Sequence, residues 1–425
     1  MTKKGTLNMK RIVYFALAMV LGMSLVLPAF ADPVSVAKSE AEPAKAALTK
    51  IFQMPGGTNT PDIAFTFEFE PEAFDYNEAN KSKLPPIPSF NVNFSEADNA
   101  KIGGDVKTYI KETEILKDID WPEEGVYTYS VTEKKDTYKL GTIDEFEEKL
   151  IYSPAKYDIE VYVAQGEQGL YILAIAAYIV INDDSNKDEE VGEKVDPTPG
   201  GDPSIEGDYS KMIFTNTYVK NNGTPEITDP EDPEDPEVID DYAVFKVTKT
   251  VDDKGDKDKP FSFKAKVNVP AIGVDPAEQV EYMAYLVKKD AAGKLVVTEK
   301  PFKLNDEESF ELKHGEYLAF TDMHVGASFN VTEEGTPNYT PSYTFVKDSK
   351  PVDNDKAAKG EPLSTGLRRI GETKNSADYL NTAGLTIPTG ISVDNLPYIV
   401  LIIASLFALV GYIAIKTRMN AKTNA

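Results

Sequence analysis

The feature that most constrains the fold is a period-two alternation of apolar and polar residues in short segments. It is clear in residues 65–69, 126–131, 245–248 and 261–264, which are separated by clusters of Gly, Pro, Asn and Asp. Such alternation is typical of strands with one buried face. A longer apolar run, residues 170–181, is too short to span a bilayer and is expected to be a strand buried on both faces. With no long amphipathic helix, the pattern predicts an all-β protein of antiparallel, Ig-like Greek-key sandwiches.

An acidic, proline-rich segment divides this β-rich body into two parts. Residues 222–240 carry four prolines interspersed with Glu and Asp. Repeated proline and like charge favour an extended, semi-rigid spacer. We therefore predict two β modules in tandem, residues 37–221 and residues 241–384, joined by this linker.

The N-terminus has the features of a secretory signal peptide. Four cations precede an apolar run over residues 12–27, and Pro28-Ala29-Phe30-Ala31 follows it. Small residues at Ala29 and Ala31 suit signal peptidase, so residues 1–31 are predicted to be removed and the mature protein to be secreted. The alternative is an uncleaved membrane anchor.

The C-terminal segment, residues 385–425, combines a proline-containing motif, an apolar span and a basic tail. Residues 397–415 are uncharged and long enough to cross a bilayer as one transmembrane helix, and the cations after them predict a cytoplasmic tail. With Pro388-Thr389-Gly390 before the span, this order resembles a Gram-positive sortase sorting signal, although no residue separates Pro from Thr. The resemblance implies cleavage between Thr389 and Gly390; the alternative is a flexible collar before a permanent membrane helix.

Composition removes several classes of function. The chain has 425 residues, no Cys, two His and a formal net charge of -25. Such an acidic body disfavours nucleic acid as a partner, and the absence of Cys excludes disulfides and thiolate sites. Two His also disfavour a His-based zinc centre, and no phosphate-binding glycine loop or serine nucleophile motif is present, so we expect no metal site and no cofactor.

Polar residues interrupt the apolar face of a strand three times in each module. Alternation places a lysine, a glutamate and an asparagine on faces otherwise formed by apolar side chains. Both glutamates end a Val-Thr-Glu sequence, and both asparagines are followed by Thr. The six residues are Lys50, Glu133 and Asn216 in the first module, and Lys249, Glu333 and Asn381 in the second.

These residue types can react with one another in an apolar core. Desolvation drives lysine towards its neutral, nucleophilic form and glutamate towards its protonated form. A neutral amine can attack the side-chain carbonyl of Asn, while Glu polarises that carbonyl and transfers protons as ammonia leaves. The product would be a Lys-to-Asn isopeptide bond, formed once and without a cofactor, because the groups are held together by the fold.

The order of these motifs resembles the self-crosslinking modules of Gram-positive pilins of the streptococcal major type. The resemblance covers both modules, the signal peptide and the anchor. It implies two bonds, each assisted by one catalytic glutamate: Lys50 to Asn216 with Glu133, and Lys249 to Asn381 with Glu333. The second module departs from the pattern, because Tyr-Leu-Asn stands where the first has Phe-Thr-Asn. Taken singly, the same residues could be a lysine reaching solvent, a hydrogen-bonded acid and a turn amide.

Together these features predict a structural cell-wall or pilus subunit of a Gram-positive bacterium, not an enzyme acting on other molecules. The expected partners are a sortase, peptidoglycan or other pilin subunits, and the membrane through the C-terminal helix. Lys211 is a candidate intermolecular acceptor, although the usual pilin motif around such a lysine is absent. The alternative function is a monomeric anchored adhesin that binds a host ligand. A hydrolase using Glu133 and Glu333 together is disfavoured because they lie in separate modules.

Overall fold

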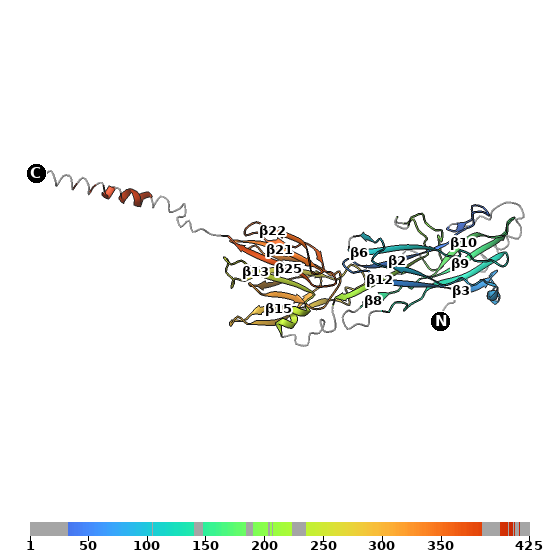
Figure 1. Cartoon of the computed structure of the whole chain (residues 1–425), viewed down its shortest axis with the longest axis horizontal. Coiled ribbons are helices and arrows are strands. Elements are labelled where there is room, and N and C mark those ends of the chain that lie inside the picture. The colour runs from blue at the N-terminus through green and yellow to red at the C-terminus, as the bar shows by residue number, and fades with distance from the viewer. Residues whose placement is uncertain are drawn as a thin grey trace.

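The fold consists mostly of β-strands in several sheets, in line with the alternation in the sequence. The structure is a computed structural model that describes residues 33–222 except 104, 140–147, 184–189, 203, 204 and 206, then residues 235–384, and lastly 400–406, 408–410, 412 and 416. Two groups of sheets lie end to end along the long axis (Figure 1). The predicted signal peptide and the residues Thr389 and Gly390 lie outside the described part of the chain.

The first module consists of two sheets that share one core. One sheet has the order β1-β10-β9-β7-β3-β4 with β11 beside β10; the other has β12-β2-β6-β5 with β8 beside β12. A short 3-10 helix, η1 (Glu78–Lys83), follows β3. The strands are β1 (Ser35–Val36), β2 (Ala47–Pro55), β3 (Ile63–Phe74), β4 (Phe90–Phe94), β5 (Lys101–Gly103), β6 (Val106–Glu114), β7 (Gly125–Glu133), β8 (Glu148–Ile151), β9 (Lys156–Gln165), β10 (Leu170–Ile181), β11 (Lys194–Val195) and β12 (Ile213–Asn222).

The second module also consists of two sheets, the first of them seven-stranded as in the first module. Its sheets have the orders β16-β15-β18-β13-β25-β21-β22 and β17-β14-β20-β23, with β24 beside β20. The strands are β13 (Phe245–Val251), β14 (Phe261–Asn268), β15 (Glu281–Lys289), β16 (Leu295–Lys303), β17 (Glu307–Leu312), β18 (Tyr317–Phe320), β19 (Met323–His324), β20 (Ser328–Glu333), β21 (Tyr339–Lys347), β22 (Lys350–Lys356), β23 (Leu363–Ser364), β24 (Arg368–Arg369) and β25 (Asn375–Ala383).

Each module contains one parallel pair among its described strands. β2 lies parallel to β12, and β13 lies parallel to β25, whereas the other pairs are antiparallel. In each case the first long strand of the module lies beside its last. The chain therefore enters and leaves each module on neighbouring strands that run in the same direction.

Each module has its own aromatic-rich core between its two sheets. Phe52, Phe65 and Phe67 in the first core come from both sheets, as do Phe245, Phe263 and Tyr379 in the second; all six are 1 % exposed or less. The run Leu170–Ile181 is one strand, β10, in agreement with the prediction from its apolar character. Alternating side chains from facing sheets thus fill both interiors.

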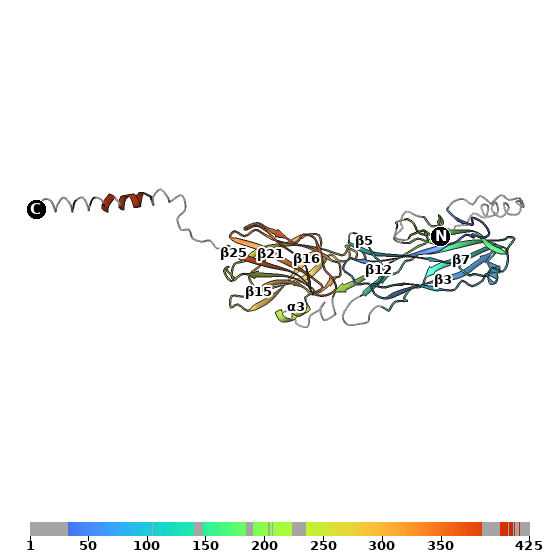
Figure 2. The same ribbon diagram turned by 45° about the horizontal axis from the view of Figure 1, so that its top comes forward.

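The expectation of an extended spacer is wrong for the end of the linker. Pro236–Tyr242 form helix α3, which lies on the second module (Figure 2). Asp235 caps this helix by accepting a hydrogen bond from the Glu237 backbone N–H, and Pro236 occupies the first turn, where its missing N–H costs nothing. Ile239 is fully buried in a small cluster with residues of β15 and β18, so tertiary packing overrides the composition.

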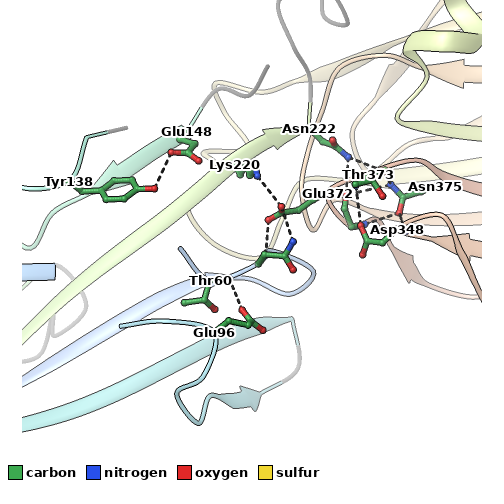
Figure 3. A network of polar contacts seen from close by, with 12 residues as sticks. Thr60, Glu96, Tyr138, Glu148, Lys220, Asn222, Asp348, Glu372, Thr373 and Asn375 are labelled. Atoms are coloured by element: carbon green, nitrogen blue, oxygen red, sulfur yellow. Dashed lines mark hydrogen bonds and ion pairs between the residues drawn. The ribbon is translucent and has the colours of Figure 1, made fainter. Parts of the chain in front are cut away.

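The two modules also contact each other directly. The end of β12 pairs with β19 of the second module, at Asn221 with His324. Figure 3 shows Glu372 at the centre of this junction. It accepts hydrogen bonds from the backbone and side chain of Asn59, at 2.6 and 3.0 Å, and forms an ion pair with Lys220 at 2.9 Å. We call this set of contacts the junction.

Part of the predicted membrane span is helical. Residues 400–406 and 408–410 are in helical conformation, and their apolar side chains are exposed. Within the described residues, no helix meets the length and hydropathy needed to cross a membrane. Several other positions of 397–415 lie outside the described part.

Candidate crosslinking site

Lys50 lies inside the first core. Strand alternation on β2 points its side chain to the same side as Leu48 and Phe52, and it is fully buried. Its ammonium nitrogen, Nζ, lies 4.4 Å from the centre of the Phe65 ring. Aromatic rings in place of water leave this amine dependent on the few polar groups that reach it.

Glu133 joins Lys50 to Asn216. Its Oε2 accepts a hydrogen bond from Lys50 Nζ at 2.7 Å, and its Oε1 accepts one from Asn216 Nδ2 at 2.5 Å. The carboxylate comes from β7 in the opposite sheet, whereas Lys50 and Asn216 come from the neighbouring strands β2 and β12. Glu133 therefore connects the other two residues predicted from alternation by hydrogen bonds, in the dry space between the sheets.

The second module contains the same arrangement. Lys249 Nζ donates to Glu333 Oε2 at 2.8 Å, and Asn381 Nδ2 donates to Glu333 Oε1 at 2.5 Å. All three side chains are buried, and Lys249 Nζ lies 4.3 Å from the Phe261 ring centre. The other lysine of this strand, Lys246, lies on its opposite face, is partly exposed and forms an ion pair with Asp240.

Strand register is the same at both sites. Lys50 is opposite Phe214 and Lys249 is opposite Tyr379, so each asparagine lies two residues beyond the partner of its lysine. This offset of two brings lysine and asparagine to the same face of adjacent parallel strands. In the sheet opposite the lysine, each glutamate lies beside a phenylalanine of the neighbouring strand. Glu133 pairs with Phe67, and Glu333 pairs with Phe263.

Burial shifts the titration of both pairs towards their neutral forms. Desolvation lowers the pKa of Lys50 to about 8 and that of Lys249 to about 8, although the neighbouring carboxylates act in the opposite direction. Desolvation likewise raises the pKa of Glu133 and of Glu333 against the attraction of their lysines. A proton can therefore move from amine to carboxylate at a smaller free-energy cost than in water.

The two asparagine carbonyls differ. Asn216 Oδ1 accepts a hydrogen bond from the backbone N–H of Ser153 at 2.7 Å. Because a backbone N–H can only donate, this bond fixes the amide with its nitrogen towards Glu133. The prediction that Glu133 itself polarises the carbonyl does not fit this contact, since it faces the amide nitrogen. In the second module, Asn381 Oδ1 is buried without a hydrogen-bond donor among the described residues.

A second acid, Asp183, lies near the first site and was not predicted. It is 1 % exposed and follows β10 at the edge of the core. Its Oδ2 accepts hydrogen bonds from Ser153 Oγ and from the Thr215 backbone N–H, both at 2.6 Å. In the sequence it is an ordinary polar residue after an apolar strand, so alternation carried no signal for it.

Lys211 lies at the surface, away from the two cores. It is half-buried, donates to the Gly207 carbonyl at 3.3 Å and stacks over the Tyr209 ring at 4.7 Å. Its role as an intermolecular acceptor stays a prediction.

Comparison with known proteins supports the resemblance inferred from the motifs. Residues 244–361 match a family model described as "Domain of unknown function (DUF7601)". A pilin from Streptococcus pyogenes serotype M1 is 23% identical over 345 residues, which cover 80% of this chain and 81% of that protein. The chain is thus homologous to a streptococcal pilin along most of its length.

Solved pilin structures are also similar to this chain. The crystal structure of the major pilin from Streptococcus pyogenes has 18% sequence identity, covers 81% of this chain and 100% of that one, and gives a TM-score of 0.30. The major pilin T3.2 from serotype GAS13637 has 16% identity over 81% of this chain and 99% of its own, with a TM-score of 0.29.

Proposed function

We propose that this protein is a structural subunit of a Gram-positive cell surface or pilus, with two Ig-like modules that crosslink themselves by Lys-to-Asn isopeptide bonds. The observation that carries the proposal is the repeated, buried lysine–glutamate–asparagine contact. Homology to a streptococcal pilin supports the cell-surface structural role.

The reaction joins Lys50 Nζ to the side-chain carbonyl carbon, Cγ, of Asn216. Glu133 takes a proton from the lysine, and the neutral amine attacks Cγ. Glu133 then donates a proton to the departing Nδ2 as the C–N bond breaks, and it accepts one from the attacking nitrogen. One ammonia leaves for each bond formed. Lys249, Glu333 and Asn381 repeat these steps in the second module.

The energetic cost of the site supports a reactive role. Burying two charges carries a desolvation penalty of several kcal/mol per ion, and replacing such a pair by apolar residues is often neutral or stabilising. Stability alone therefore gives little reason to keep a Lys–Glu pair in either core. The same costly pair occurs twice with the same register, and the covalent bond would remove the charge that makes it costly.

The position of the bonds suits a protein under tension. Each bond would connect the first long strand of a module to its last strand. Force entering at Lys50 would then pass directly to Asn216 and leave along β12 towards the second module, without loading the chain between them. Each bond also restricts the unfolded chain, as a disulfide would.

Anchoring completes the proposal. The exposed apolar helix around residues 400–410 supports insertion of the predicted span in the membrane before sorting. A sortase would cut between Thr389 and Gly390 and transfer the new carboxyl group to peptidoglycan or to a lysine, with Lys211 as candidate, of another subunit. The protein would have no catalytic turnover on other molecules.

The direct test is the intact mass of the chain from Asp32 to Thr389. We expect a deficit of two ammonia masses, reduced by one in Glu133→Ala and by one in Glu333→Ala. Glu316→Ala is the matched control, because Glu316 is a buried carboxylate that contacts only backbone N–H groups in the described structure. Full mass in the unsubstituted protein would rule out the crosslinks.

Assembly is tested on the bacterial surface. Wall extracts should contain a ladder of high-molecular-weight species that disappears when the sortase gene is deleted. A single band would instead favour the monomeric anchored protein.

A further inference from the structure

The Ser153 backbone lies where charge would develop in the first module. When an amine attacks Cγ of Asn216, the carbonyl oxygen becomes an oxyanion. Ser153 N–H already lies 2.7 Å from that oxygen, within the range of donors that stabilise such charge. Ser153 is 2 % exposed, so water does not weaken the interaction.

Asp183 fixes the position of Ser153 through hydrogen bonds. Its Oδ2 accepts the Ser153 hydroxyl and the backbone N–H of Thr215, the residue next to Asn216. The Ser153 hydroxyl oxygen also accepts the Ala155 backbone N–H at 3.2 Å. One carboxylate thus connects the loop carrying the donor with the strand carrying the reacting amide. Pro154 restricts the backbone of Ser153 further.

We propose that the Ser153 backbone N–H is the catalytic oxyanion donor of the first crosslinking reaction and that Asp183 is its positioning residue. The inference rests on the proposed crosslinking function and deepens it. Negative charge forms on Asn216 Oδ1 as Lys50 Nζ bonds to Cγ, and the Ser153 N–H stabilises it. The charge returns to the carbonyl as the C–Nδ2 bond breaks and ammonia leaves with the proton from Glu133.

This assignment divides the work between two groups. Glu133 contacts the two nitrogens and transfers protons, while Ser153 acts on the oxygen. In the second module, Asn381 Oδ1 has no hydrogen-bond donor among the described residues. Glu333 would therefore have to transfer protons at the amide nitrogen and also stabilise the charge on the oxygen, which requires the amide group to rotate. The first bond is therefore expected to form faster than the second.

The test compares two variants with the same methyl side chain at position 153, one with the backbone N–H and one without it. Nonsense suppression in cell-free translation introduces lactic acid at position 153, which replaces the N–H by an ester oxygen. Ser153→Ala is the matched control, because it has the same methyl side chain and retains the N–H. Samples quenched in acid and denaturant are digested, and the Lys50–Asn216 and Lys249–Asn381 peptides are counted against time.

We expect the ester to slow the first bond by about 10²-fold relative to Ser153→Ala. The second bond, formed in the same molecules, should keep its rate and so show that the protein has folded. Equal rates for the ester and Ser153→Ala would overturn the donor role. Absence of both crosslinked peptides from the unsubstituted protein would instead overturn the proposed function itself.

Asp183 is tested by graded substitution. Asp183→Ala should slow the first bond about tenfold, a smaller effect than loss of the donor itself. Asp183→Asn, which keeps an acceptor oxygen, should restore much of the rate. No slowing in Asp183→Ala, or no restoration by Asn while the second bond forms normally, would refute the positioning role.

Discussion

The two triads have the same contacts to glutamate but different surroundings for the asparagine oxygen. Both place a lysine and an amide on opposite oxygens of one buried carboxylate, with the amide two residues beyond the lysine's partner. The first adds a backbone donor and a buried acid. The lysine, glutamate and asparagine that both modules share supply the nucleophile, the proton transfer and the proximity. The backbone donor and the buried acid found only in the first module affect the rate of the reaction. The comparison therefore separates what the reaction needs from what accelerates it.

The largest expected effect is the loss of either bond. Lys50→Met and Lys249→Met remove the nucleophile and leave an apolar side chain of similar length. Each bond closes a loop longer than ~100 residues, so chain entropy predicts a loss of about 4.7 kcal/mol in unfolding free energy. Because this term grows only with the logarithm of loop length, the two modules should lose nearly equal amounts. Differential scanning calorimetry measures both.

Glu133→Gln extends this prediction. It prevents the bond and also leaves the buried amine without its acid, which costs about 3–5 kcal/mol beyond the loss of the crosslink. A Glu133→Gln protein as stable as Lys50→Met would show that the amine finds another partner or stays neutral. The control is Glu316→Gln, which keeps both crosslinks.

The second effect is the order of bond formation in the unsubstituted protein. With one donor on Asn216 and none described on Asn381, the first bond should form roughly 10²-fold faster. Quenched samples from a synchronised translation reaction, analysed by peptide mass, should contain singly crosslinked molecules with only the Lys50 bond. An accumulating intermediate that carries only the Lys249 bond would contradict the comparison.

Much of the fold could be predicted from the sequence, because alternation is a local signal. It identified the strands and the faces on which Lys50, Lys249, Glu133 and Glu333 lie. It could not find Ser153 or Asp183, whose roles depend on a loop and a strand end meeting across the core. Helix α3 was missed for a similar reason, since burial of Ile239 outweighs a linker-like composition.

The third effect is on pH dependence. The reaction requires one proton shared by the pair, with Lys50 neutral and Glu133 protonated. Above about pH 8, where the lowered pKa of Lys50 lies, that proton is lost and no acid remains for the leaving ammonia. Below the raised pKa of Glu133, a second proton keeps the amine charged. The rate should be level between these limits and fall about tenfold per pH unit outside them.

The two modules should share the alkaline limit, because the pKa of Lys249 is also lowered to about 8. Their acid limits should respond differently to Asp183→Asn. The charge of Asp183 helps to raise the pKa of Glu133, so its removal should move the acid limb of the first module to lower pH and leave the second unchanged. Rates of peptide crosslinking across a pH series measure both limbs, and coincident shifts in the two modules would contradict a local effect.

The smallest effect is expected between the modules, because neither crosslink crosses the junction. The contacts that the end of β12 makes with the second module are noncovalent: strand pairing with β19 and the ion pair of Lys220 with Glu372. Glu372→Gln keeps the shape of the side chain but removes the charge that Lys220 pairs with. The pair is mostly buried, so the expected loss is about 1 kcal/mol in unfolding free energy, with both crosslinks intact.

Exposed Glu361→Gln is the control, and calorimetry should show the two transitions separating only in Glu372→Gln. Unchanged transitions would mean that strand pairing alone couples the modules.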